Sequence, residues 1–359
     1  MVLSGFAICA LNGYFRLPLL IIFYRYNHYS YWYLPSARCV RGVRTTRAQH
    51  QHDDRKGKAR LIMLIYWFLF CRSCGLHYLC SPIKKDIMSK KHILLVNDIA
   101  GYGKVATAAM LPILSYLGHP VYNLPTALVS NTLDYGKFNI LETTDYIKGV
   151  FPVWKELGFI FDAIATGFIA SERQAKLVAD YCREQAERGT TIFVDPIMGD
   201  EGKLYNGVTA ATINSMREMI SVADLTFPNY TEACYLTSSK YDEKGVNFEE
   251  AKRLLDGLRL IGTKSAMITS ILVDGTPSVV GYNHATDKYF TLPYTEIPVH
   301  FPGTGDIFSA ILIGHLLDGE ELIPSTQKAI DGVYKLIDLN KDNKDKNRGI
   351  PLEKYLGVL

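Results

Sequence analysis

Long apolar stretches are scarce in this 359-residue sequence. Two apolar runs, residues 17–23 and 61–71, are shorter than the ~18 residues that a membrane-spanning helix needs. Neither run has the layout of a signal peptide with a small-residue cleavage site. We therefore expect that neither run spans a membrane, and we expect no membrane span in residues 88–359, the main region of the protein.

Cysteine is scarce after residue 87, where only Cys182 and Cys234 occur. Two cysteines do not form a disulfide framework, so this part of the chain is expected to work in the reducing cytoplasm. The other five cysteines lie in residues 1–87, where the Cys71-x-x-Cys74 pair has no second pair at zinc-finger spacing. A structural metal site is therefore not expected.

Two familiar nucleotide-binding signatures are missing. The stretch Gly101-Tyr102-Gly103-Lys104 contains Gly-x-Gly-Lys, but it has neither the Gly-x4-Gly-Lys-Ser/Thr spacing of a phosphate loop nor the pattern Gly-x-Gly-x-x-Gly. A dinucleotide-binding fold is therefore not indicated.

Charge divides the chain into two regions. Residues 1–87 hold 13 Lys and Arg against three acids, a net charge of +10, which leaves −7 for residues 88–359 of the overall +3. The acidic main region argues against a nucleic-acid surface there. The first region is crowded with aromatic residues and lacks periodicity, so we expect a disordered or membrane-associating extension, or an upstream start that precedes a natural start at Met88.

From residue 92 onward, short apolar strands alternate with amphipathic helices. This alternation predicts an α/β fold with a mostly parallel central sheet and helices on both faces. Two further segments, 278–282 and 289–292, indicate an antiparallel hairpin at one edge, and the charged residues 341–348 indicate a solvated loop. The predicted strands are 92–97, 121–125, 163–166, 191–194, 224–227 and 265–269. The predicted helices are 104–117, 144–157, 171–188, 208–222, 231–237, 247–261, 307–317 and 326–340.

The most informative stretch is 301–310, Phe-Pro-Gly-Thr-Gly-Asp-Ile-Phe-Ser-Ala. A glycine-rich turn here leads into an apolar helix, which places the amides of Gly303, Thr304 and Gly305 at a helix N-terminus suited to an anion. Asp306 follows in the first turn, where a carboxylate can accept a proton from a hydroxyl that attacks a phosphoryl group. An ordinary N-terminal acidic residue is the alternative explanation.

Two acidic elements follow predicted strands. Asp195 and Asp200 flank Pro196 and Gly199 at one strand end, a pattern that suits a Mg²⁺–phosphate site because Mg²⁺ uses few direct carboxylates. Asn229 and Glu232 begin a helix after another strand, where Asn-x-x-Glu is equally typical of a capping box.

Polar residues end three other strands. Asn97 and Asp98 follow the first strand and can bind a polar substrate or form a turn, while Thr269 and Ser270 end a later strand and can contact nucleotide phosphates. Ser130, Asn131 and Thr132 carry groups suited to a small polar ring, and Tyr205 can cover a ring.

Together these elements resemble the pyridoxal/pyridoxamine kinase branch of the ribokinase-like superfamily. The resemblance covers residues 90–355, and its most specific parts are Gly303-Thr304-Gly305-Asp306, Asp195 to Asp200, and Asn229-x-x-Glu232. It implies a three-layer ribokinase-like sandwich, formed by residues 88–359, that uses ATP and Mg²⁺ to phosphorylate a vitamin B6 hydroxymethyl group. It also implies a homodimer, and leaves the use of K⁺ open.

The resemblance assigns the site residues as follows. Asp306 is the base, and Gly303, Thr304 and Gly305 hold the transferred phosphoryl group. Asp195 and Glu232 surround the metal. The residues on the ATP side are Asp195, Asp200, Tyr205, Asn229, Glu232, Thr269 and Ser270, and those on the vitamin side are Asn97, Asp98, Ser130, Asn131 and Thr132.

Three alternatives remain. In the first, the protein is a hydroxymethylpyrimidine kinase of the same superfamily. In the second, the same fold binds a ligand as a sensor without catalysis. In the third, residues 1–87 tether the protein to a membrane.

Overall fold

The computed structural model describes residues 22–26, 29–33, 40–41, 90–205 and 208–359, in two units, 1–89 and 90–359. In the first unit, an antiparallel sheet has the order β1-β2-β3, and the sequence pattern did not indicate these strands: β1 (Ile22–Tyr26), β2 (Tyr29–Tyr33) and β3 (Val40–Arg41). The predicted start at Met88, the run 61–71 and the Cys71–Cys74 pair lie outside the described residues. The nature of residues 1–87 stays a prediction.

The second unit is organised around a nine-stranded sheet with the order β14-β13-β12-β11-β8-β7-β4-β5-β6. Six strands are mutually parallel: β4 (Ile93–Ala100), β5 (Val121–Val129), β7 (Ala163–Thr166), β8 (Thr191–Val194), β11 (Leu225–Thr226) and β12 (Ser265–Val273). The predicted antiparallel hairpin is confirmed as β13 (Thr276–Asn283) and β14 (Lys288–Pro293) at one edge. The sequence pattern did not indicate β6 (Ile140–Glu142) or the separate hairpin of β9 (Gly199–Asp200) and β10 (Lys203–Leu204).

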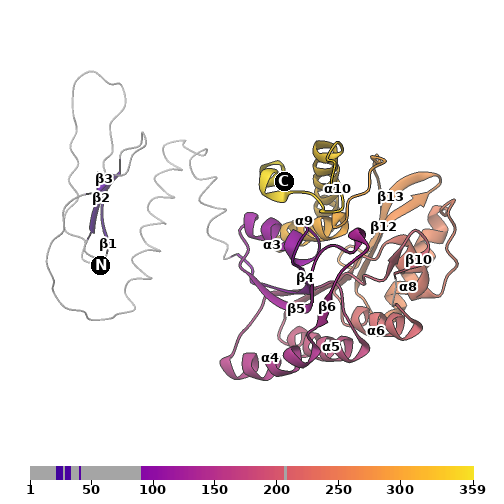
Figure 1. Cartoon of the computed structure of the whole chain (residues 1–359), viewed down its shortest axis with the longest axis horizontal. Helices are drawn as coiled ribbons and strands as arrows, with labels where there is room; N and C mark the ends of the chain where they lie inside the picture. The colour runs from indigo at the N-terminus through magenta and orange to yellow at the C-terminus, as the bar shows by residue number, and fades with distance from the viewer. Residues whose placement is uncertain (1–21, 27–28, 34–39, 42–89, 206–207) are drawn as a thin grey trace, which may run out of the picture. The chain divides into compact units, whose positions relative to one another are not determined.

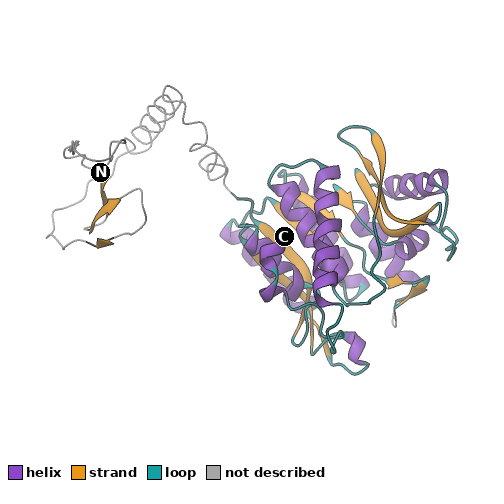
Figure 2. Cartoon of the chain, turned by 90° about the horizontal axis from the view of Figure 1, so that it is seen from above, coloured by secondary structure: helices purple, strands orange, loops and turns teal. Residues whose placement is uncertain are grey.

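Helices cover both faces of this sheet, which confirms the three-layer α/β sandwich (Figures 1 and 2). One face is packed by α3 (Thr107–Tyr116), α9 (Thr304–Leu317) and α10 (Leu322–Asn340). The opposite face is packed by α4 (Thr144–Leu157), α5 (Glu172–Ala186), α6 (Ala210–Ile220), α7 (Tyr230–Thr237) and α8 (Phe248–Ile261). The described residues of this unit also form the 3₁₀ helices η2 (Leu133–Tyr135), η3 (Leu352–Lys354) and η4 (Leu356–Val358).

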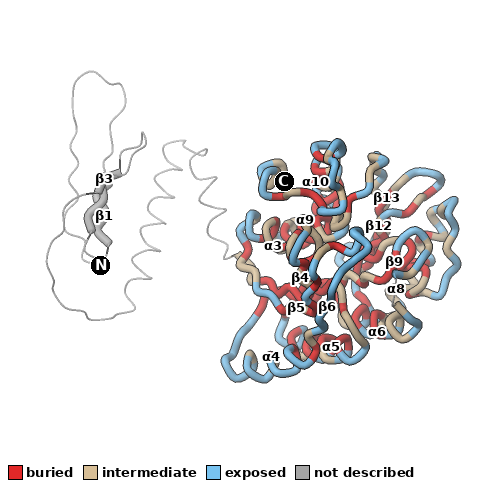
Figure 3. The backbone as a smooth tube through the Cα atoms, in the orientation of Figure 1, coloured by how far each residue is buried: buried red, intermediate tan, exposed pale blue. Residues whose placement is uncertain are grey.

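Strand β4 shows why the central strands read as continuous apolar runs. Ile93 and Leu95 pack under α3 and α9, whereas Leu94 and Val96 pack against the opposite helix layer. Successive side chains of a strand point to opposite faces, so a strand covered on both sides must be apolar at every position. The tube in Figure 3 is accordingly buried along most of this strand, and only Asp98 and Ile99 are of intermediate exposure.

Helix α9 confirms the predicted apolar helix and begins at Thr304, three residues earlier than the apolar run alone indicated. Gly303 precedes it with φ of +83°, a left-handed conformation that glycine adopts without strain. A Cβ at this position would lie 2.4 Å from the carbonyl oxygen of Lys104. Figure 1 shows α9 beside α3, although the two helices are far apart in the sequence: α3 ends at Tyr116 and α9 begins at Thr304.

None of the helices in the described residues is both long enough and apolar enough to cross a bilayer.

Candidate active site

The topology fixes where a ligand can bind. Strand β4 has β5 on one side and β7 on the other, so the chain leaves β4 in one direction and returns past it to β7. In parallel sheets of this kind, the crevice at such a reversal lies beyond the carboxyl ends of the strands and holds the ligand. Asn97 and Asp98 lie at this end of β4, beside a bulge in its pairing with β5.

Asp306 reaches this crevice from the first turn of α9. Its Oδ2 accepts a hydrogen bond from the main-chain amide of Ala106 at 2.7 Å, and its Oδ1 accepts a longer one from Asn97 Nδ2 at 3.4 Å. Burial raises the pKa of Asp306 to about 6, while these two donors act in the opposite direction. The carboxylate is therefore oriented by two elements and is more basic than an ordinary aspartate.

Asn97 is 1% exposed and lies behind Asp306. Its Oδ1 accepts hydrogen bonds from the amides of Asp98 at 3.0 Å and Phe168 at 2.9 Å. Gly167 provides the space, because a Cβ there would lie 2.5 Å from the Asn97 side chain. Asn97 thus joins the ends of β4 and β7 to Asp306, and a direct contact with substrate remains only a prediction.

Asp98 is half-buried next to Asn97. Burial raises the pKa of Asp98 to about 7, and the nearby charge of Asp306 adds to the effect. Two carboxyl groups of the same crevice therefore titrate near neutral pH, one of them at the predicted base and one at a predicted substrate contact.

The amides at the start of α9 are available for an anion. Among the described residues, no acceptor forms a hydrogen bond with the main-chain N–H of Gly303, Thr304 or Gly305. The first amide of this turn with a partner is that of Ile307, which bonds to the carbonyl of Gly303 at 3.0 Å. Free donors and the helix dipole together favour a negatively charged group at this point.

The first acidic element lies across the crevice at the end of β8. Asp195 Oδ2 accepts a hydrogen bond from Ser309 Oγ at 3.1 Å, and no described residue donates to its Oδ1. Burial, and then the charges of Glu232 and Asp306, raise the pKa of Asp195 well above its usual value. These three carboxyl groups therefore form one cluster around the end of the sheet.

Glu232 is 3% exposed and completes a capping box with Asn229 at the start of α7. Its carboxylate accepts hydrogen bonds from the amides of Met198 at 2.8 Å and Asn229 at 2.9 Å. Asn229 Nδ2 donates to the carbonyl of Gly199 at 2.8 Å. Both explanations offered for Asn-x-x-Glu thus apply, because the same capping box also ties α7 to the loop that carries Asp195 and Asp200.

Burial raises the pKa of Glu232 to about 7, although the three amide hydrogen bonds that it accepts lower it. A divalent cation near Asp195 and Glu232 would relieve the clustering of negative charge. The described residues hold no group of three or more His, Cys, Asp and Glu arranged to bind a metal. The pair Asp195 and Glu232 fits Mg²⁺, which protein sites usually hold through one or two carboxylates together with substrate phosphates and water.

The remaining nucleotide-side residues surround this cluster. Thr269 and Ser270 lie at a bulge of β12, where Ser270 has φ of +53°, and Thr269 forms a bridge with Asn229. Asp200 is exposed, and Tyr205 is 47% exposed beside the β9–β10 hairpin. The structure brings Thr269, Ser270 and Asp200 to one end of the sheet. The contacts of these residues with ATP remain predictions.

Ser130, Asn131 and Thr132 form a loop that is largely bonded to itself. Ser130 Oγ donates to Asn131 Oδ1 at 2.6 Å, and Asn131 Nδ2 donates to the carbonyl of Lys137 at 2.8 Å. Thr132 is buried, and its hydroxyl donates to the carbonyl of Asn347 at 2.5 Å. An open hollow of about 480 Å³ adjoins this loop, lined by Tyr102, Ser130, Asn131, Tyr135, Lys137 and Asp345.

Sequence reasoning missed three contributors, Ser309, Ala106 and Gly167. Ser309 had a usable signal, because it is a polar residue on an apolar helix at three positions after Asp306 and so on the same side. Ala106 contributes only its amide and Gly167 only an absent side chain, so neither residue type carries a signal.

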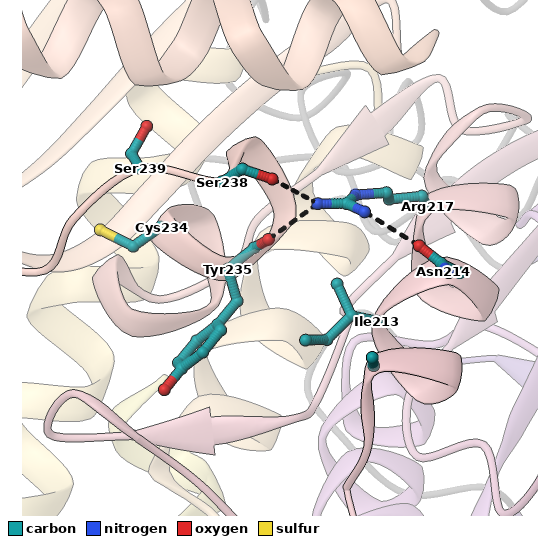
Figure 4. A pocket seen from close by; sticks show the side chains of 8 residues that line it. Ile213, Asn214, Arg217, Cys234, Tyr235, Ser238 and Ser239 are labelled. Atoms are coloured by element: carbon teal, nitrogen blue, oxygen red, sulfur yellow. Dashed lines mark hydrogen bonds between the residues drawn. The ribbon is translucent and has the colours of Figure 1, made fainter.

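A second pocket, of about 340 Å³, lies between α6 and α7 (Figure 4). In it, Arg217 donates to the carbonyls of Leu236 at 2.9 Å and Tyr235 at 3.1 Å and to Ser238 Oγ at 2.9 Å. Both carbonyls belong to the last turn of α7, so Arg217 caps the helix that carries Glu232 at its other end.

Comparison with known proteins agrees with this geometry. The family model described as phosphomethylpyrimidine kinase matches residues 140–350. A pyridoxal kinase of Arabidopsis thaliana is 27% identical over 258 residues, 66% of this chain and 80% of that protein. A crystal structure from Bacteroides thetaiotaomicron, described as a candidate phosphomethylpyrimidine kinase in a form with pyridoxal, is 35% identical with a TM-score of 0.72, over 75% of this chain and 96% of that one. Pyridoxal kinase from Lactobacillus plantarum is 26% identical with a TM-score of 0.68, over 75% and 96%. The chain therefore belongs to the phosphomethylpyrimidine kinase family and has the ribokinase-like fold of the pyridoxal kinases.

Proposed function

We propose that this protein transfers the γ-phosphoryl group of ATP to the 5′-hydroxymethyl group of a vitamin B6 vitamer. The observation that supports the proposal most strongly is the arrangement at α9. There, the oriented carboxylate of Asp306 lies directly beside the amides of Gly303, Thr304 and Gly305, which have no partner in the described part of the chain. A base and an anion-binding turn on consecutive residues are what transfer of a phosphoryl group to an alcohol requires.

Asp306 orients the acceptor hydroxyl and accepts its proton. With a pKa of about 6, the group is largely ionised at neutral pH, yet it holds a proton better than an aspartate of pKa ~3.9. The Ala106 amide and Asn97 keep the carboxylate in position, so little reorganisation accompanies proton transfer.

The amides of residues 303–305 donate to the phosphoryl oxygens as negative charge spreads over them. Phosphoryl transfer has a loose transition state, so positioning and charge stabilisation account for most of the catalysis. The left-handed Gly303 directs the turn, and the dipole of the 14-residue α9 adds positive potential at the same point.

Asp195 and Glu232 would hold Mg²⁺ on the nucleotide side, assisted by Asp200 and Asn229. Mg²⁺, when bound with ATP, neutralises phosphate charge. The open Oδ1 of Asp195 is the natural direct ligand, while both oxygens of Glu232 accept main-chain amides and favour a contact through water. Thr269, Ser270 and Tyr205 would line the ATP side, and Asp98 with the 130–132 loop would line the acceptor side.

The acceptor is proposed from the relatives. The relatives from Arabidopsis thaliana and Lactobacillus plantarum are named pyridoxal kinases, and the 35% identical structure was obtained with pyridoxal. The name of the matching family favours a second candidate acceptor, a hydroxymethylpyrimidine. We further propose a homodimer in the cytoplasm, supported by family resemblance and by the two free, buried cysteines of the described residues.

A substrate panel tests the proposal. Purified protein is given ATP and Mg²⁺ with pyridoxal, pyridoxamine, pyridoxine or hydroxymethylpyrimidine, and both ADP and the phosphorylated acceptor are measured. We expect the B6 vitamers to be phosphorylated with a higher kcat/KM than the pyrimidine. A higher value for the pyrimidine would move the assignment to thiamine precursors. Ligand binding without any product would identify a sensor and refute the kinase.

A further inference from the structure

The C-terminal residues 345–353, here named the C-terminal strap, cross the loop that precedes α3. The amide of Lys104 donates to the carbonyl of Arg348 at 2.8 Å, and Asn347 Nδ2 donates to the carbonyl of Asp134 at 3.2 Å. Together with the bond from Thr132 to Asn347, these contacts join the strap to both loops on the proposed acceptor side. The predicted solvated loop is indeed mostly exposed, but its backbone is docked.

The strap is anchored firmly on either side of these contacts. Ile350 and Leu352 are fully buried in the core formed with α3 and α9. Tyr135 donates from its hydroxyl to Asp345 at 2.8 Å, and Glu353 forms an ion pair with Lys104. The strap therefore has a fixed position relative to the helix that carries Asp306.

Gly349 is the point where the strap meets the active site. It has φ of +77°, and a Cβ there would lie 2.8 Å from the carbonyl oxygen of Lys104 and 3.2 Å from that of Pro302. The Lys104 carbonyl in turn lies against Gly303. Gly349 thus packs on the loop that ends at Ala106 and also on the turn that begins the anion site.

We propose that the C-terminal strap is a positioning element of the phosphoryl-transfer site, which acts by holding the 104–106 backbone against the 302–303 turn so that the Ala106 amide stays on Asp306. This inference rests on the proposed kinase activity. The described contacts of the strap are with the surrounding loops and not with Asp306, so its effect passes through Ala106 and residues 303–305.

A purely structural strap would behave differently from a positioning one. If the strap only stabilised the fold, loss of its contacts would lower the stability of the protein and leave the kcat of the folded enzyme unchanged. Displacement of Ala106 instead removes a hydrogen bond that lowers the pKa of Asp306. The other groups that face Asp306 are Asn97 and Asp98 on β4 and Asp195 after β8, and the charge of Asp306 raises the pKa of both acids. The acidic limb of kcat would therefore move to higher pH.

The test compares Gly349→Ala with Gly158→Ala. Gly158 ends α4 with φ of +69° and has no atom within 4 Å of its would-be Cβ, so the variant repeats the backbone strain without the contact. It lies before the amino end of β7, whereas the proposed site lies at the carboxyl ends of the strands. For Gly349→Ala we expect kcat to fall roughly 10- to 100-fold, an acidic limb shifted upward, and a KM for ATP within about 3-fold of wild type. Gly158→Ala should keep the wild-type kcat and pH profile.

Hydrogen exchange at the Ala106 amide gives a readout that is independent of turnover. Exchange there should accelerate in Gly349→Ala and remain slow in wild type and Gly158→Ala. If Gly349→Ala does not fold, Glu353→Gln, which weakens the contact with Lys104, replaces it with the same expected direction. Unchanged exchange together with an unchanged kcat in the folded variant would overturn the strap's role. An inactive wild type that still shows the exchange difference would instead refute the kinase activity.

Discussion

Ser309 Oγ donates a hydrogen bond to Asp195 Oδ2 at 3.1 Å, and so links the helix of the proposed base to the strand end of the proposed metal ligand. Ser309 lies three residues after Asp306, and the carbonyl of Gly305, at 2.9 Å, is a second acceptor for the same hydroxyl proton. The acceptor half and the nucleotide half of the site are therefore fixed to the same helix. Such a link keeps the distance between the two halves constant, which is a requirement for in-line transfer.

Replacement of Asp306 by Asn should lower kcat by ~10²–10⁴, because the amide cannot accept the proton of the acceptor hydroxyl. Binding of ATP, measured by calorimetry, should change little. Asp145→Asn on the exposed side of α4 serves as the control and should retain full activity. A wild-type kcat in Asp306→Asn would remove this residue from the mechanism.

Replacement of Ser309 by Ala removes a donor to a buried carboxylate, which costs about 1–2 kcal/mol. Because this hydrogen bond favours the ionised form of Asp195, its loss raises the pKa of Asp195 further and weakens the binding of Mg²⁺ with ATP. We expect the KM for ATP at limiting Mg²⁺ to rise by roughly 5- to 30-fold, the same free energy expressed as a ratio.

Ser325→Ala is the matched control for Ser309→Ala. Ser325 is also buried and also bonds to a carbonyl four residues earlier, that of Glu321 at 2.8 Å, but it has no carboxylate partner. Equal effects of the two variants on KM would show that the Ser309–Asp195 contact has no functional weight.

Replacement of Glu232 by Gln should destabilise the protein by about 1–3 kcal/mol, since an amide group cannot accept from all the main-chain amides that this carboxylate satisfies in a buried place. Glu250 forms an equivalent capping box with Asn247 at the exposed start of α8. The stability of Glu250→Gln should therefore stay within about 0.5 kcal/mol of wild type. Urea unfolding measures both. Similar losses would mean that burial of Glu232 contributes nothing.

Asp306 should lower stability at neutral pH. Its folded pKa of about 6 exceeds the unfolded value of ~3.9, so the folded state binds more protons between these values. The favourable contribution is complete below pH ~4 and is lost as the pH rises through about 6. Asp306→Asn should thus be more stable than wild type at pH 8, with a difference that shrinks toward pH 5.

Urea midpoints across this pH range check the last prediction. Asp145→Asn should follow wild type at every pH. A gap between Asp306→Asn and wild type that widens as the pH falls would contradict the assigned direction of the pKa.

Several elements could be read from local pattern alone. The apolar runs of β7 and β8 gave their bounds without error, because a strand buried on both faces has no alternative placement for its side chains. The predicted helix 104–117 was too long at its start. Ala106 instead adopts φ of +49°, and its amide bonds to Asp306, a contact 200 residues away that no local pattern contains.

Strand β6 illustrates the opposite error. Its three residues are exposed and pair with β5 only along the edge of the sheet, so neither burial nor alternation marks them. The β9–β10 hairpin is equally short, and it exists because Gly199 has space only for a hydrogen beside Lys203 and Leu204. Short elements held by neighbours leave little trace in a single sequence.

The sequence by itself determined the alternation of strand and helix, the glycine-rich turn before an apolar helix, and the acids at the strand ends, because each depends on chemistry within a few residues. Tertiary structure alone decided that Asn97 lies behind Asp306, that Ser309 reaches Asp195, and that Gly349 packs against Lys104 and Pro302. Those contacts join segments up to 245 positions apart, Lys104 to Gly349 being the longest, and only the packing of the sheet and its two helix layers brings them together.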